Sequence, residues 1–404
     1  MRANPLVRAI SAATVLTLAA SSVVSAQTEV DTRFATERGE TLLSATVTNA
    51  LDDSATNALI ERTARKYHAD PLGGKTSEPE VAKKGSKKEP ARGGWMSFPD
   101  LADTDAVTQK VLDVAGEPTP DLIVVSGGDW KANVGIARLN PSSFIVDMGQ
   151  PAPCLNENGQ ADLGGECLDG QAPGNYLPVD FAVEEGAYLA GVIAARESRG
   201  KPLAVISGSE DCLECDRYAT GFINGARSVE PEIEIQTAYL ANDEASGFGD
   251  EASAKAFTQA FLDVYQPGVL MPIGRGAAMG MIEAACEAEV RVIGAGIDIG
   301  SVRPDLANPC VMASVTKDSG RAVEEAMFYF SQGSSPPVIT YDLTGGGVAV
   351  TDEWRLSSTK RVDTNDFYDA AEIAIRTDQV DPCPDGCGRF IPEPQSEEPA
   401  APAG

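Results

Sequence analysis

The chain has 404 residues, and its 60 Asp and Glu residues outnumber 32 Lys and Arg residues, for a formal charge of −28 at pH 7. This balance argues against nucleic-acid binding, which depends on neutralising phosphates with Lys and Arg. The length allows a large hydrophobic core, which we expect to be divided between two lobes.

The first 26 residues have the pattern of a secretory signal peptide. Arg2 and Arg8 precede or flank the start of an apolar run, and Val24 and Ala26 are small residues at the −3 and −1 positions of the expected cleavage site. A membrane anchor is the weaker alternative, because the run is short and rich in alanine. No Cys precedes Cys154, so we expect a secreted, periplasmic or cell-surface protein without a lipidated cysteine.

Residues 27–104 show less periodicity than the rest of the chain. A strand is expected within 41–51 and a helix within 52–69, and a lysine-rich stretch at about 70–95 then lacks any helical or strand period. This stretch indicates a flexible insertion, with a basic patch for a partner as the alternative. We treat 27–104 as a divergent N-terminal segment.

From about residue 105 onward, short apolar strands alternate with helices. This alternation predicts an α/β fold of parallel sheets with helices on both faces. Strands are expected at 121–128, 143–149, 203–209, 232–240, 268–274, 291–298 and 310–316, and helices at 106–116, 129–139, 179–195, 214–229, 251–265, 276–288 and 319–333. The helix expected within 179–195 is apolar nearly all round and rich in Gly and Ala, which indicates burial on most sides.

Small and acidic residues follow several of these strands. They include Asp129, Asp147, Gly274, Gly276 and Asp298. Because ligands of open α/β sheets bind at the carboxyl ends of the strands, these residues are candidates for a binding site. For each of them taken singly, a role as a turn residue or a helix cap is the alternative.

Eight cysteines after a predicted signal peptide indicate disulfide bonds. Their spacing favours local pairs, although the sequence leaves the connectivity open: Cys154–Cys167, Cys212–Cys215, Cys286–Cys310 and Cys383–Cys387. A zinc site is disfavoured because the cysteines are scattered and His68 is the sole histidine. We expect no metal and no cofactor.

The Cys-x-x-Cys spacing of Cys212 and Cys215 raises the alternative of a thiol–disulfide enzyme. The motif follows a predicted strand at a helix start, where a helix N-terminus lowers a thiol pKa. A static local disulfide is the competing interpretation, and we favour it. Hydrolytic chemistry lacks a Ser–His or Cys–His pair, because His68 lies beside the predicted insertion. We therefore expect no catalytic residues and no enzyme.

An ordered series of motifs resembles the basic membrane protein family of ABC-transporter substrate-binding proteins, also called BMP or PnrA-like. The series comprises VDFAVEEGAYLAGVIAA, PLAVISG, GFINGA, GFGDEASAKAF, GRGAAMGMIEAACEAEVRVIGAGID and VMASVTKD. The resemblance implies a type I periplasmic-binding-protein fold, in which two doubly wound parallel-sheet lobes are joined by three crossovers. It also implies delivery of a small ligand, often a purine nucleoside, to an ABC permease in the membrane.

This resemblance assigns segments to the two lobes. The N-terminal lobe is expected from 105–150 and 310–333, and the C-terminal lobe from 151–309 and 334–390. The last residues, 391–404, are acidic and proline-rich and are expected to be a disordered tail.

The resemblance also implies ligand-binding residues. Phe181 matches a family aromatic that stacks on a base, Asp147 a strand-end acid and Lys317 a lysine near the cleft. The alternatives are core packing for Phe181, a capping role for Asp147 and a surface position for Lys317.

Further candidates follow other strands. Asp129 and Trp130 are expected to wall the first lobe, and Gly274 and Gly276 to bring backbone N–H groups near the ligand, with Arg275 between them. Where the family has two acids at one strand end, this chain keeps only Asp298. The ligand is accordingly left open between a nucleoside and another small polar molecule.

The expected function is that of an extracytoplasmic solute-binding protein of an ABC importer, with a small-molecule ligand and a membrane permease as partners. A secreted ligand sensor of the same fold that is not coupled to transport is the alternative. Genomic neighbours distinguish the two, because a permease and an ATPase accompany an importer.

Overall fold

The computed structural model describes residues 44–49, 60, 95–101, 104–116, 120–127, 130–149, 173–210, 212–242, 247–307, 309–332, 335–336, 338–356, 363–384 and 387. The predicted signal peptide, most of the lysine-rich stretch, the Cys154–Cys167 pair and the acidic tail lie outside these ranges. Among the helices within them, none combines the length and the hydropathy needed to cross a bilayer.

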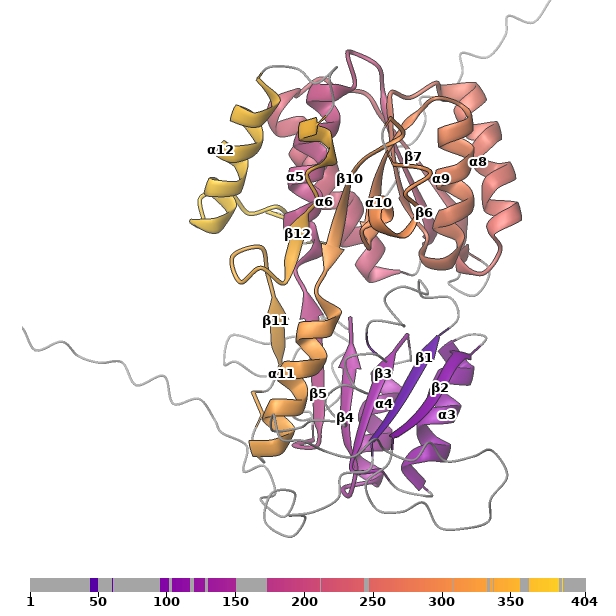
Figure 1. Ribbon diagram of the computed structural model, residues 1–404, viewed down its shortest axis with the longest axis vertical. Coiled ribbons are helices and arrows are strands. Elements are labelled where there is room, and N and C mark those ends of the chain that lie inside the picture. Colours follow the sequence, from indigo (N-terminus) through magenta and orange to yellow (C-terminus); the bar gives the residue numbers. More distant parts are fainter. Residues whose placement is uncertain are drawn as a thin grey trace, which may run out of the picture.

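Two six-stranded sheets form two lobes that are stacked along the long axis of the molecule (Figure 1). The first sheet has the order β11-β5-β4-β3-β1-β2, and all its pairings are parallel. Its strands are β1 (Ser44–Asn49), β2 (Trp95–Leu101), β3 (Leu122–Ser126), β4 (Phe144–Met148), β5 (Tyr176–Phe181) and β11 (Ile339–Tyr341).

The second sheet has the order β12-β10-β9-β8-β6-β7, with β12 antiparallel to β10 at one edge. Its strands are β6 (Leu203–Ser209), β7 (Ile235–Ala241), β8 (Val269–Ile273), β9 (Arg291–Gly296), β10 (Val311–Lys317) and β12 (Val348–Val350). Both sheets therefore place their first strand between the second and the third. This order creates a topological switch point in each lobe, where open α/β sheets bind ligands.

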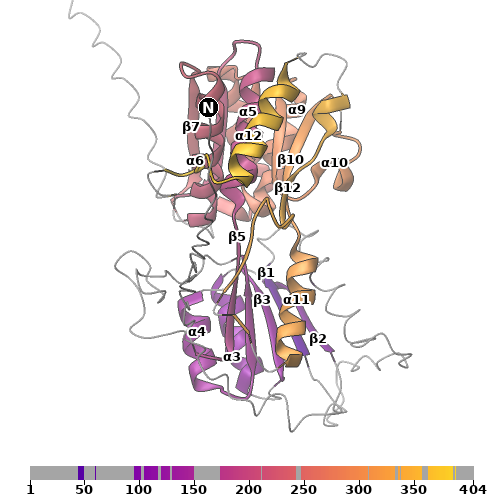
Figure 2. The ribbon, with the colours of Figure 1, turned by 90° about the vertical axis from the view of Figure 1, so that its left-hand side faces the viewer.

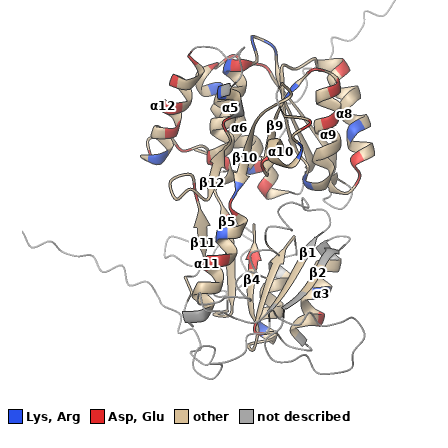
Figure 3. Ribbon diagram, viewed as in Figure 1, with Lys and Arg blue, Asp and Glu red and all other residues tan. Residues whose placement is uncertain are grey.

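Helices cover both sheets, as the alternating sequence pattern predicts. The first lobe carries α3 (Thr104–Gly116), α4 (Trp130–Leu139) and α11 (Ser319–Gln332) (Figure 1). The second lobe carries α5 (Val183–Glu197), α6 (Leu213–Val229), α8 (Glu251–Tyr265), α9 (Ala278–Glu287), α10 (Ile299–Val302) and α12 (Thr364–Arg376). Charged residues lie mainly on the helices and loops, whereas the strands carry few of them (Figure 3).

The chain passes between the lobes after β5, after β10 and after β11 (Figures 1 and 2). These passages are the three crossovers that the family resemblance implies, and the type I periplasmic-binding-protein fold is confirmed. The structure corrects the expected lobe boundaries at three strands. Residues 176–181 and 339–341 belong to the first sheet rather than the second lobe, and 311–317 belong to the second sheet rather than the first lobe. The reason is that each crossover follows a strand instead of preceding it.

The N-terminal segment contributes more to the first lobe than its weak periodicity suggested. The strand expected within 41–51 is β1, which lies inside the first sheet between the edge strand β2 and β3. Strand β2 has no counterpart among the expected strands, and its first residue, Trp95, falls at the end of the expected insertion. Ala45 and Val47 of β1 are fully buried, so this strand completes the core of the first lobe.

The small residues of α5 allow a close helix–helix contact with α6. A Cβ atom added to Gly191 would overlap the carbonyl oxygen of Phe222, and one added to Gly225 would overlap that of Tyr188. Nearly all of α5 is buried, and α12 covers it from outside (Figure 2). The side chains of α5 that face α6 are therefore small because α6 packs directly on the backbone of α5. The residues VDF, which were expected in this helix, belong to β5 instead.

Candidate functional site

A cavity of about 390 Å³ lies between the two lobes at the carboxyl ends of their strands. Its volume falls within the range of about 300–1,000 Å³ that is usual for small-molecule sites. Both lobes contribute to the wall, which is lined by Ser126, Gly127, Met148, Gly149, Glu214, Cys215, Tyr218, Glu251, Ile273, Gly274, Arg275, Gly276, Ala278, Met279, Ala295, Gly296, Ile297, Ile299, Val302, Arg303 and Lys317.

The first lobe supplies the ends of β3 and β4. Gly127 and Gly149, which directly follow these strands, have positive φ angles of 81° and 76°. Only glycine adopts such angles without steric cost, and the chain thereby turns away at the strand ends with its backbone facing the cavity. Met148 adds an apolar side chain beside Gly149.

The second lobe supplies a glycine-rich turn between β8 and α9. Gly274 precedes a single 3-10 turn over Arg275–Ala277, and a Cβ atom on Gly274 would clash with the side chain of Met281. Arg275 has a φ of 44°, in the left-handed region, and its guanidinium carbon lies 4.7 Å from the ring centre of Phe248. The turn therefore places backbone groups and one cation at the cavity wall.

The first turn of α6 brings a carboxylate to the same wall. Cys212 caps this helix, and Glu214 follows two positions later. The Oε1 atom of Glu214 lies 2.6 Å from the Nζ atom of Lys317, at the end of β10. Burial by itself would raise the pKa of Glu214, but the charges of Lys317 and Arg275 outweigh it and hold that pKa below its ordinary value. Glu214 is therefore ionised at neutral pH.

Three of the residues expected at the ligand line this cavity: Gly274, Gly276 and Lys317, together with Arg275. They come from two different strand ends, β8 and β10, that the parallel sheet brings to one edge. The Nζ atom of Lys317 lies 5.7 Å from the ring centre of Phe181, so Lys317 lies at the junction of the two lobes.

Phe181 itself is packed in the junction and does not line the cavity. Its side chain is buried, and its ring stacks on that of Tyr341, with a centroid distance of 5.4 Å. The two residues end the neighbouring strands β5 and β11. This is the core-packing alternative that the sequence left open.

Asp147 and Asp298 also lie away from the cavity lining. Asp147 is fully buried in the first lobe and accepts hydrogen bonds from Asn133 Nδ2 at 2.8 Å and from the Tyr176 hydroxyl at 2.9 Å. Asp298 caps α10 and accepts from the backbone N–H of Ser301 at 3.0 Å. Both carboxylates therefore organise the strand ends around the cavity.

Asp129 lies outside the described residues, and Trp130 begins α4 with a side chain that also lies outside the description. Both follow Gly127, which lines the cavity. Their proposed role as walls of the first lobe remains a prediction.

Sequence reasoning missed Glu214, Met148, Met279 and Arg303, all of which line the cavity. The position of Glu214 could have indicated a residue at the ligand, because it lies in the first turn of a helix that directly follows a strand. The Cys-x-x-Cys spacing around it instead indicated a disulfide or a redox site. The methionines carried no such signal, because an apolar residue at a strand end is equally consistent with core packing.

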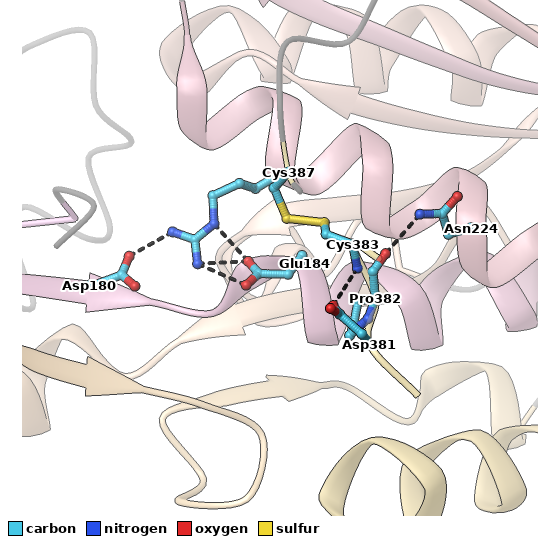
Figure 4. Close-up of a disulfide and its surroundings, with 8 residues drawn as sticks. Asp180, Glu184, Asn224, Asp381, Pro382, Cys383 and Cys387 are labelled. Atoms are coloured by element: carbon cyan, nitrogen blue, oxygen red, sulfur yellow. Dashed lines mark hydrogen bonds and ion pairs between the residues drawn. A yellow bond between two sulfur atoms is a disulfide. The ribbon is translucent and has the colours of Figure 1, made fainter. Parts of the chain in front are cut away.

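Three expected cysteine pairs have their sulfur atoms at disulfide distance. These distances are 2.04 Å for Cys212–Cys215, 1.95 Å for Cys286–Cys310 and 1.98 Å for Cys383–Cys387. Figure 4 shows the third pair beside Asn224 of α6, whose Nδ2 atom donates to the carbonyl oxygen of Pro382 at 2.8 Å. The segment after α12 therefore returns to α6.

An ion-pair cluster at the junction links α6 to the first crossover. The Arg217 guanidinium contacts Asp180 of β5 at 2.6 Å and Glu184 of α5 at 2.7 Å. Figure 4 labels the two carboxylates and marks their ion pairs with dashed lines. Although burial opposes the charged form, the two carboxylates raise the pKa of Arg217 above its ordinary value. This cluster lies where the two lobes meet.

Comparison with known proteins agrees with this architecture. The family model described as "ABC transporter substrate-binding protein PnrA-like" matches residues 166–374. The ABC transporter nucleoside-binding protein BmpA of Lactococcus lactis subsp. cremoris is 29% identical over 191 residues, covering 43% of this chain and 52% of that protein. Basic membrane protein A of Borreliella burgdorferi is 31% identical over 155 residues, covering 37% and 42%. The chain thus spans about half the length of these relatives.

Solved structures share the fold at low sequence identity. A solute-binding protein of an ABC transporter system from Aeropyrum pernix K1 has a TM-score of 0.62 at 15% identity, covering 84% of this chain and 92% of that one. A carbohydrate transporter solute-binding protein from Agrobacterium radiobacter, in complex with D-arabinose, has a TM-score of 0.54 at 15% identity, covering 80% and 98%. At this identity the likeness shows the fold alone.

Proposed function

Because the chain belongs to the PnrA-like family of ABC transporter substrate-binding proteins, we propose that it works outside the cytoplasm as a solute-binding protein. In this proposal it closes its two lobes over a nucleoside or a similar small polar ligand and delivers the ligand to a membrane permease. The cavity between the lobes carries the proposal, because both lobes line it. A ligand that contacts both walls favours the closed arrangement over the open one.

The polar groups of the cavity suit a hydroxylated ligand. Lys317 and Arg275 supply donors, Glu214 supplies an acceptor, and Gly274 and Gly276 bring backbone groups to the wall. Apolar side chains of Met148 and Met279 provide surface for a flat base. Asp129 and Trp130 remain proposed contacts at the end of β3, and a nucleoside-binding relative supports this ligand class.

Mass spectrometry of the protein purified under native conditions tests the ligand class directly. We expect a neutral nucleoside or another small hydroxylated molecule to be released on denaturation. A panel of nucleosides and sugars in thermal unfolding then identifies binders, because a ligand that binds only the folded state stabilises it by RT ln(1 + [L]/Kd). Failure of the whole panel, with no ligand released, contradicts the proposal.

Lys317→Met tests the site. Lys317 lines the cavity and contacts Glu214, so we expect this variant to lose most of the thermal shift given by the ligand. Lys201→Met is the matched control, because Lys201 is exposed on the second lobe away from the cavity lining. Equal thermal shifts in the two variants would remove this cavity as the binding site.

The Cys212–Cys215 pair is proposed to be structural rather than catalytic. Cys212 and Cys215 are only 1% and 3% exposed, which restricts attack by the thiol of a protein substrate. We therefore expect the purified protein not to accelerate the reduction of insulin disulfides by a small-molecule thiol. Catalysed insulin reduction would favour the thiol–disulfide enzyme instead.

A sensor of the same fold that is coupled to a kinase rather than to a permease is distinguished by the neighbouring genes.

A further inference from the structure

We propose that Glu214 determines the charge class of the ligand: together with Lys317 it binds neutral hydroxyl groups and rejects ligands that carry phosphate or carboxylate. This inference rests on the proposed function, because it concerns the same cavity. It adds a residue and a selectivity that the family match does not supply.

The Glu214–Lys317 pair is built into the cavity wall. Glu214 lies in the first turn of α6 and Lys317 at the end of β10, and both side chains line the cavity. Their side chains are 18% and 14% exposed, and the two charged atoms lie 2.6 Å apart. A ligand group that reaches one of them therefore meets the other.

A hydroxyl group can satisfy both partners at once. It donates its proton to the Glu214 carboxylate and accepts a hydrogen bond from the Lys317 ammonium, so neither charge loses its compensation. Two vicinal hydroxyls would serve the pair better than one, since each can face one partner. The pair thus provides a site for a diol without any rearrangement of charge.

An anionic group meets a different situation. To bind Lys317 it must approach the Glu214 carboxylate, which is held ionised by the charges around it. In a partly buried site two like charges repel more strongly than they do in water. Glu251 adds a second carboxylate to the lining of the cavity.

Of the other cations of the lining, Arg303 contacts the carboxylates of Asp305 at 2.8 Å and Glu283 at 3.2 Å, which reduce its attraction for an anion. The guanidinium of Arg275 lies over the ring of Phe248, and its charge acts on Glu214. Removal of the Glu214 charge would leave Lys317 without its carboxylate, and the same wall would then favour an anion.

The cysteines on either side act as positioning residues for Glu214. The Sγ atom of Cys212 accepts a hydrogen bond from the backbone N–H of Cys215 at 3.1 Å, and the two sulfur atoms lie at disulfide distance. Glu214 lies within this bracketed turn. Its carboxylate is therefore presented to Lys317 by a turn that is closed both by the hydrogen bond and by the sulfur pair.

Glu214→Gln tests the inference by isothermal titration calorimetry with adenosine, guanosine, inosine and uridine and with their 5′-monophosphates. For the wild type we expect neutral nucleosides to bind at least about a hundredfold more tightly than the monophosphates. The variant should lose roughly tenfold or more in nucleoside affinity, as expected when a hydrogen bond to a charged group is weakened. Its preference should also shift toward the monophosphates. Glu232→Gln removes an exposed charge of the same lobe and should keep the wild-type ratio.

Glu214→Asp provides a second readout should the glutamine variant fail to fold. It keeps the negative charge but shortens the side chain, so nucleoside affinity should fall while the monophosphates are still rejected. Monophosphate binding by this variant would overturn the inference. So would a wild-type preference for monophosphates, or an unchanged ratio in the glutamine variant, and both would leave the proposed function intact. Absence of binding to every nucleoside and monophosphate by the wild type would overturn the nucleoside proposal and the inference together.

Discussion

The Nη1 atom of Arg217 lies 2.6 Å from Oδ1 of Asp180, which joins helix α6 of the second lobe to the end of strand β5 in the first sheet. The same guanidinium contacts Glu184 at 2.7 Å, and all three side chains are at most 16% exposed. An ion cluster with this degree of burial is sensitive to the loss of one member, because the partners that remain keep their desolvation cost.

Arg217→Met should therefore lower the free energy of unfolding by about 3 kcal/mol, because two carboxylates are left in a poorly solvated junction. Urea unfolding followed by circular dichroism measures the change. Adding Asp180→Asn to this variant should recover part of the loss, since one unpaired charge is then removed. Arg227→Met, an exposed position on the same helix, is the control. Equal effects of the two arginine substitutions would show that the cluster contributes little.

Gly191→Ala should destabilise the second lobe strongly. The new methyl group would overlap the backbone of Phe222, and neither helix can move away without disturbing a fully buried contact. Overpacking of this kind costs about 3 kcal/mol or more when backbone must shift. Gly135→Ala is the matched control, because Gly135 lies within α4 and a Cβ atom there meets nothing within 4 Å. That substitution should stabilise the protein by about 0.5–1 kcal/mol. Comparable midpoints in a thermal melt of the two variants would contradict the close packing of α5 on α6.

Glu185 should make the stability of the protein depend on pH. Burial raises the pKa of Glu185 above its ordinary value, against the lowering effect of the hydrogen bond that it accepts from the Leu343 N–H at 2.7 Å. The folded state therefore holds this proton more tightly than the unfolded chain. The corresponding stability is present below the unfolded pKa and is lost as the pH rises through the folded pKa.

Glu185→Gln should accordingly be more stable than the wild type at neutral pH, with the difference shrinking as the pH falls below the ordinary glutamate range. Urea unfolding at a series of pH values measures this difference. Glu232→Gln, at an exposed position, should show little pH-dependent difference from the wild type. The stability difference between Glu185→Gln and the wild type is compared at each pH. If the variant gains stability over the wild type in acid and loses it at neutral pH, the expected sign is wrong.

Removal of the Cys286–Cys310 pair should cost more stability than removal of Cys383–Cys387. The first pair spans 24 residues and the second only 4. Chain-entropy arguments give about 3.5 kcal/mol for the longer loop and about 2 kcal/mol for the shorter one. Paired Cys→Ser substitutions, compared in chemical unfolding under oxidising conditions, measure both losses. If a thiol assay of the unfolded wild type finds these cysteines free, the expected difference disappears.

Much of the fold could be predicted from the chain because its parallel strands are buried on both faces. Strands such as β6 and helices such as α8 occur at the residues where the apolar runs predicted them. The sequence did not predict the strands β2, β5, β11 and β12. β2 and β5 each carry a proline and an acid, whereas β11 and β12 have only three residues each. Segments of this kind become strands because a neighbouring strand supplies hydrogen bonds. They cannot be predicted from their own residues, because that neighbour comes from another part of the chain.

The candidate site also contains some residues that the sequence predicts and others that it does not. Gly274 and Gly276 were predictable because they follow a recognisable strand, and Lys317 because it matches a lysine of the family. Glu214 and Met148 were not, since an acid in a first helical turn and a methionine at a strand end have common structural roles. Asp147 and Phe181 also follow or end strands, but their side chains point into the first-lobe interior and the junction instead of the cavity.

The sequence by itself determined the alternation of strands and helices and the family, because these depend on period and order along the chain. Its short cysteine spacings only favoured local pairs, and the structure brings three of those pairs to disulfide distance. The tertiary structure decided which strands belong to which lobe, and which strand-end side chains face the cavity between them. The physical reason is that a crossover brings residues far apart in the chain to one edge. Glu214 and Lys317 are 103 residues apart, and only the packing of α6 beside the end of β10 makes them a pair.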